Sequence, residues 1–86
     1  MKTLKLKKND IITVNHRMGR HDAGTYQVQD VFEHDEFDTV FLAQVLKSGH
    51  VSQNKDRQLI MNTHKNWKAP SLATVDSAIK RGAITL

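Results

Sequence analysis

Apolar and polar residues alternate with a period of two through most of the first two thirds of the chain, and this alternation restricts the fold most strongly. The clearest run spans residues 25–32, in which Tyr26 and Val28 fall on one face of an extended strand. At Val31 the alternation shifts by one residue, which predicts a β-bulge or a bend near Asp30. The pattern predicts a mainly β fold.

Four segments have the composition of β-strands, namely residues 10–14, 25–32, 39–46 and 58–63. Segment 39–46 is the most apolar and resembles a strand buried on both faces or a short helix. Its β-branched and aromatic residues, and the turn at residues 47–49, favour the strand. The predicted core comprises Ile12, Val14, Val28, Val31, Phe41, Ala43, Val45, Leu59, Met61 and Val75.

One helix is predicted over residues 72–81, because apolar residues recur there at spacings of three and four. Ser71 or Thr74 can supply the N-cap side chain. Gly82 stands where many helices place a left-handed residue. The tail, residues 83–86, can add a short edge strand.

The 86 residues form one domain, with a barrel over about 3–68 and a helix over about 71–82. So short a chain buries only about 60–65% of its unfolded surface, so we expect one shallow binding face. The absence of cysteine excludes disulfides, thiolate zinc sites and thiol catalysis. The sequence shows neither a signal peptide nor a membrane span, so we expect a cytoplasmic protein without a membrane partner.

The stretch from Lys8 to Val31 resembles the hairpin of the KOW family. There, a polar residue and an aspartate open a strand of alternating apolar residues, and a basic loop with glycine leads to a second such strand. The matching positions are Asp10, Ile12, Val14, Gly19, Gly24, Val28 and Val31, with Asn9 in place of the usual glycine. The resemblance implies a small antiparallel SH3-like barrel or half-barrel that contacts RNA, DNA or RNA polymerase through its loop.

Charges are sorted along the chain, whose net charge is +4. Residues 1–20 carry six Lys or Arg side chains against one acid, and residues 47–81 carry seven against two. Residues 30–38 hold five of the nine acids and no Lys or Arg. A surface with a positive side attracts polyanions, chiefly nucleic acid.

The leading hypothesis is therefore a non-enzymatic module that binds DNA or RNA through the basic loop and a second cluster around the single tryptophan. Arginines beside a glycine can fork onto phosphate oxygens, and a tryptophan between two lysines can stack on a base. The candidate residues are His16, Arg17, Arg20, His21, Lys55, Arg57, Lys65, Trp67 and Lys68. Alternatively, these basic residues are solvated and the tryptophan closes the core.

The competing hypothesis is a small phage-type adaptor or inhibitor that binds a host protein such as a polymerase or a nuclease. Its acidic loop would meet a basic partner surface, with an interleaved phenylalanine as the apolar anchor. The candidate residues are Glu33, Asp35, Glu36, Phe37 and Asp38. A thin core favours burial of Phe37, which would leave the loop as a charged cap on the barrel.

Catalysis and metal binding have little support in the sequence. The five histidines show none of the close pairings on a helix that zinc sites use, so we expect no metal and no cofactor. His34 and Asp38 could form a base and its orienting group, and His16 or His64 could serve a ribonuclease. No nucleophile motif or phosphate-binding loop accompanies them, so we expect no enzyme activity.

Overall fold

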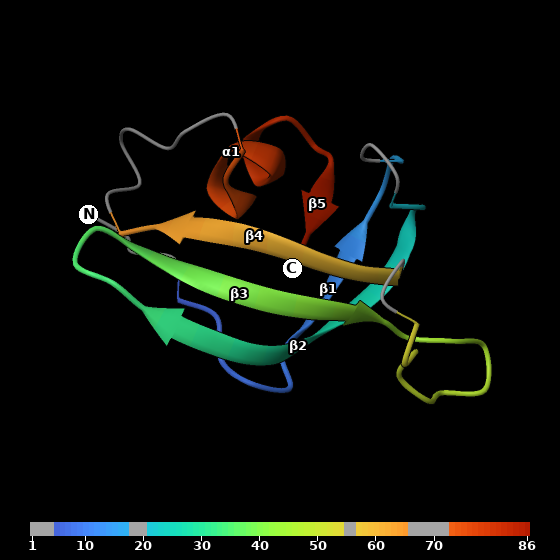
Figure 1. Cartoon of the computed structure of the whole chain (residues 1–86). Helices are drawn as coiled ribbons and strands as arrows, with labels where there is room; N and C mark the ends of the chain where they lie inside the picture. The colour runs from blue at the N-terminus through green and yellow to red at the C-terminus, as the bar shows by residue number, and fades with distance from the viewer. Residues whose placement is uncertain (1–4, 18–20, 55–56, 66–72) are drawn as a thin grey trace.

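The chain folds into one curled antiparallel sheet that forms a half-barrel, closed on its open side by a short helix (Figure 1). The computed structural model describes residues 5–17, 21–54, 57–65 and 73–86. The strands lie in the order β4-β3-β2-β1-β5. In chain order the elements are β1 (Ile11–Val14), β2 (Gly24–Glu33), β3 (Phe37–Gln44), β4 (Gln58–His64), α1 (Val75–Lys80) and β5 (Ile84–Thr85).

The core lies on the inner, concave face of the sheet, where α1 packs against β4 and β5. The helix adds Val75 and Ala78 to this core. Alternation on β1 confirms the period-two prediction, since Ile12 and Val14 are buried while Ile11 is exposed. The fully buried members are Ile12, Val14, Tyr26, Val28, Val40, Leu42, Val75, Ala78 and Ile84.

The predicted strands and the single C-terminal helix are confirmed, with shifted boundaries. β3 begins at Phe37, two residues before the predicted start, because Phe37 and Asp38 still pair with β4. Of the two predicted caps, Thr74 is the N-cap, and its side chain accepts a hydrogen bond from the Ser77 amide at 3.2 Å. Within the described residues no helix is long and apolar enough to span a membrane.

The backbone is irregular at three places, and the sequence predicts two of them, the bulge and the left-handed residue after the helix. The register between β2 and β3 shifts between Val28 and Asp30, which is the predicted bulge. Asn9 has φ 78°, a left-handed conformation that asparagine tolerates better than most residues. Asp10 stabilises this turn because its carboxylate accepts the Lys7 amide at 2.8 Å. Gly82 has φ 77° after the helix, as predicted.

Three predicted core residues are only half-buried, namely Val31, Phe41 and Val45. Phe41 departs from the prediction for a clear reason. It points to the outer, convex face of β3, whereas its neighbours Val40 and Leu42 point inward. The helix lies on the inner side, so nothing among the described residues covers this outer face as a second layer.

Candidate functional site

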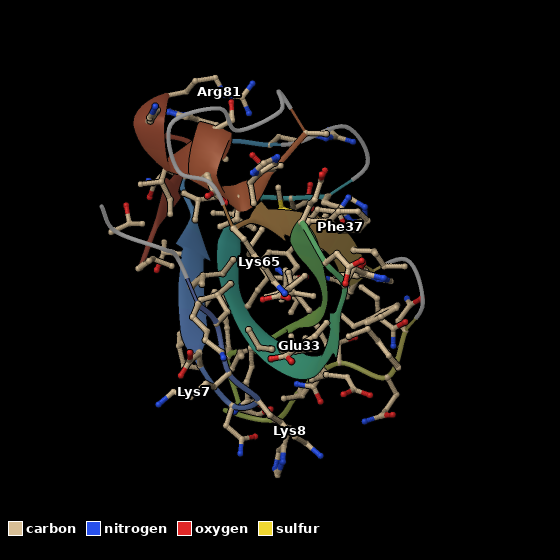
Figure 2. The ribbon with its side chains drawn as sticks, turned by 90° about the vertical axis from the view of Figure 1, so that its left-hand side faces the viewer. Lys7, Lys8, Glu33, Phe37, Lys65 and Arg81 are labelled. Atoms are coloured by element: carbon tan, nitrogen blue, oxygen red, sulfur yellow. The ribbon has the colours of Figure 1, made fainter. Side chains whose placement is uncertain are left out.

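The antiparallel order gives the half-barrel two distinct ends. The connections 15–23 and 45–57 meet at one end, which we call the loop end. Residues 34–36 join β2 to β3 at the other end, which we call the turn end, and β4 also finishes there. Figure 2 views the turn end, where Glu33, Phe37 and Lys65 lie together, with Arg81 above and Lys7 and Lys8 below.

Residues 34–36, the acidic turn, are held by backbone contacts and by one lysine. The His34 amide donates to the Phe37 carbonyl at 2.9 Å, which closes the turn. The Lys65 amide donates to the Glu36 carbonyl at 2.9 Å, and the Lys65 ammonium donates to the His34 carbonyl. Lys65 is therefore engaged with the turn rather than presented to a phosphate.

Two of the five acids in this region are already paired. Asp38 is only 3% exposed, and its carboxylate lies 3.7 Å from the Lys65 ammonium. Glu33 lies 3.6 Å from the Lys5 ammonium on the surface, where such a pair contributes little to stability. The expectation that Asp38 faces a partner is wrong, because strand alternation turns it inward beside Thr63.

The other three acids, Asp30, Asp35 and Glu36, are exposed. No ion pair joins them to any residue in the described ranges. Asp35 and Glu36 also line an open depression of about 460 Å³ together with His64 and Lys65. The acidic turn therefore keeps two carboxylates available for a partner.

The outer face beside this turn is aromatic. Phe32 is 52% exposed and meets the half-buried Phe41 edge to face, with ring centroids 5.2 Å apart. Ile60, paired with Phe41 across β3 and β4, is 62% exposed. Phe32, Phe41, His34 and Thr39 line an open hollow of about 320 Å³. We call Phe32, Phe41 and Ile60 the outer apolar patch.

Phe37 lies at the edge of this patch and is half-buried, so the expectation that a thin core buries it completely is wrong. Its ring stacks at a tilt on His34, with centroids 4.6 Å apart. His34 Nε2 lies 3.3 Å from the Thr39 hydroxyl, and that hydroxyl donates to Asn62 Oδ1 at 3.1 Å. The Thr39 hydroxyl therefore bridges the side chains of His34 and Asn62 on the outer face.

The three strands that carry this face contain no Lys or Arg. All 13 basic side chains of the chain lie outside β2, β3 and β4. The charged residues within these strands are Asp30, Glu33 and Asp38. Asp38 and its cross-strand partner Glu33 lie on the inner side, so the outer face of these strands carries one carboxylate, Asp30, beside its apolar surface, in a protein whose net charge is +4.

The candidate nucleic-acid residues that the structure describes lie at both ends of the half-barrel. Arg17 and Arg57 lie at the loop end, whereas Lys65 lies at the turn end. Exposed His16 and half-buried His21 flank the same loop as Arg17. Arg20, Lys55, Trp67 and Lys68 lie outside the described residues.

Tyr26 connects the two segments of the loop end. Its hydroxyl donates to the Asp22 carbonyl at 2.9 Å. Burial raises the pKa of Tyr26, the Asp22 carboxylate raises it further, and the Arg57 charge opposes this. Arg57 also donates to the Gln44 side chain at 2.8 Å, and Arg17 lies 3.9 Å from Asp22. Both arginines therefore already have partners within the protein.

Sequence reasoning missed Phe41, Ile60 and Asp30 as surface-site residues. A signal for Ile60 is present in the sequence, because Leu59 and Met61 on either side of it take the inner face. In the described part of the chain no group of three His, Asp or Glu side chains is arranged to hold a metal ion.

Comparison of the chain with known protein families, with curated proteins and with solved structures found no match.

Proposed function

We propose that this protein is a non-enzymatic protein-binding module that docks its outer face onto a basic, partly apolar surface of another protein. One observation carries the proposal: exposed Phe32 and Ile60 lie on strands without any Lys or Arg, beside the free carboxylates of the acidic turn. Nucleic acid would meet negative charge on this face, whereas a basic protein surface would meet its complement.

The two kinds of group would act differently. Exposed aromatic side chains anchor an interface, since a few of them carry most of the binding energy. The carboxylates of Asp30, Asp35 and Glu36 would speed association with a basic partner and weaken the binding of acidic proteins. A polymerase or a nuclease is one partner class with this chemistry, because the groove that holds its nucleic acid is basic.

Photo-crosslinking from the patch tests the proposal. A photoreactive phenylalanine analogue at Phe32 keeps the aromatic shape and should form a crosslink to a partner protein. The partner peptide that carries the crosslink should have a net positive charge. The double variant Asp35→Lys with Glu36→Lys should reduce capture strongly, and so should added salt. Arg17→Glu, a charge reversal at the loop end, serves as the matched control and should leave capture unchanged.

The affinity of the captured partner then tests the anchor. Phe32→Ala should weaken binding by about 30-fold or more if the ring is a main anchor. The proposal would be contradicted if the crosslinking yield did not change in the Asp35→Lys and Glu36→Lys double variant. It would also be contradicted if Phe32→Ala bound the partner with the affinity of the wild type.

A second candidate function, nucleic-acid binding at the loop end, is favoured by the contacts around Tyr26. Asp22 and Arg57 both lie close enough to influence its hydroxyl, so the basic loop and the start of β4 are neighbours. Binding of this kind should weaken with salt at a slope of about 0.9 per phosphate contacted on duplex DNA. Titration of single- and double-stranded DNA and RNA at two salt concentrations, repeated with Arg17→Glu plus Arg57→Glu, would reveal it.

A further inference from the structure

We infer that the hollow on the outer face, lined by Phe32, His34, Thr39 and Phe41, takes one arginine side chain of the partner protein. This inference rests on the proposed function and specifies what the partner places at the centre of the interface. Three features of the hollow support this inference, namely its aromatic rings, the carboxylate beside it and its open shape.

The rings come from adjacent strands. Phe32 on β2 and Phe41 on β3 meet edge to face at an interplanar angle of 80°. In such a pair the two ring planes are nearly perpendicular, and an aromatic face borders the angle between them. A flat guanidinium can lie against one of these faces and is attracted by its negative π-surface.

The charge comes from Asp30. It is the cross-strand partner of Phe41 and so lies on the same outer face. One of its oxygens accepts the Val31 amide at 2.9 Å, which fixes the carboxylate beside the patch. Asp30 has no ion-pair partner in the described ranges, so its carboxylate is available on the same face as the hollow, beside Phe41.

The open shape of the hollow favours arginine over lysine. An ammonium ion is compact and strongly hydrated, and an open site does not strip its water. A guanidinium is weakly hydrated, stacks on aromatic rings and forks onto a carboxylate, so it can use both features at once. An apolar side chain would use the rings alone and gain nothing from Asp30.

Four synthetic peptides separate the arginine site from the general attraction of the acidic turn. Each carries the same lysine and glycine flanks around one central residue, which is arginine, citrulline, lysine or leucine. Citrulline keeps the shape of arginine but lacks its charge. Binding is measured by fluorescence anisotropy at low salt, where the flanking lysines meet the acidic turn in all four cases.

The arginine peptide should bind about three- to five-fold more tightly than each of the other three. Phe32→Leu retains apolar bulk but removes the ring, and Asp30→Asn removes the charge. Each should bring the ratio of the arginine-peptide affinity to the lysine-peptide affinity to about one, whatever its effect on the affinity for the lysine peptide alone. Leu46→Ala removes an exposed apolar side chain at the loop end and should change nothing.

Equal binding of the four peptides, tighter binding of the leucine peptide, or an arginine preference that survives Phe32→Leu would overturn the inference. Absence of peptide binding would overturn it as well. The proposed function is judged separately by crosslinking to a whole protein, so partner capture that depends on the acidic turn would stand even if the arginine preference failed.

Discussion

Asp76 shows how one buried carboxylate can organise a strand end. It is fully buried on α1, and its Oδ1 accepts the backbone amide of His64 at 3.0 Å. This contact ties the helix to the last residue of β4, next to the acidic turn. Burying a carboxylate is costly, so the hydrogen bond it makes must offset part of that cost.

Replacing Asp76 separates this hydrogen bond from the charge. Asp76→Ala leaves the His64 amide without its acceptor and should lower the free energy of unfolding by about 1–3 kcal/mol. Asp76→Asn keeps an acceptor oxygen and should cost clearly less. Urea denaturation of both variants measures the difference. Equal losses would show that the contact with His64 does not stabilise the fold.

Tyr26 links stability to alkaline pH. The pKa of Tyr26 is raised above the ordinary tyrosine value of 10.0, by burial first and by Asp22 second. The folded protein therefore holds this proton more tightly than the unfolded chain does. The resulting stabilisation is complete below about pH 10 and is lost as pH rises through the raised pKa of the folded state.

Tyr26→Phe tests this linkage. At neutral pH the variant loses the hydrogen bond to Asp22 and should be about 1 kcal/mol less stable. Above pH 10 it should lose stability more slowly than the wild type, because it has no phenol to ionise. Urea midpoints measured between neutral and strongly alkaline pH compare the two slopes. Parallel slopes would contradict the assignment of the alkaline loss to Tyr26.

At the scale of the element, β3 shows how far the sequence predicts the fold and where it stops. Four consecutive apolar residues, 40–43, fit burial on both faces, and only the position of α1 decides that one face stays open. The predicted acidic loop includes Asp38 because this residue is polar, whereas the structure places Asp38 in β3. Its burial depends on Lys65, which lies far along the chain.

Local signals predicted other features correctly. The shift in alternation at Val31 marks the bulge, and Thr74 with Gly82 marks both ends of the helical region. These features are set by residues within a few positions of one another. The outer apolar patch instead depends on strand pairing, which brings together Phe32, Phe41 and Ile60 from three segments.

Truncating a side chain to alanine should lower the free energy of unfolding by different amounts on the two faces of β3. Leu42 is 1% exposed on the inner face, so Leu42→Ala should cost about 2–5 kcal/mol. Phe41 is half-buried on the outer face, so Phe41→Ala should cost about 1–2 kcal/mol. Thermal or urea unfolding ranks the two variants. A larger cost for Phe41→Ala would show that the outer face is covered.

For the whole molecule, the arrangement of charge follows from the topology. Lys and Arg residues fall in the segments outside the three long strands, with Lys80 in α1, and β2, β3 and β4 contain none. A positive net charge therefore does not describe the face that carries the exposed aromatic residues. Net charge alone would indicate attraction of nucleic acid, whereas the proposed docking face would complement a basic protein.

The most direct test of the docking face is NMR chemical-shift mapping of the ¹⁵N-labelled protein with two probes, the central-arginine peptide and a single-stranded oligonucleotide. We predict saturable shifts at Phe32, Thr39, Phe41 and Ile60 with the peptide, lost in the Asp35→Lys and Glu36→Lys double variant. Peptide shifts absent from these strands, together with oligonucleotide shifts around Arg17 and Arg57, would contradict the account.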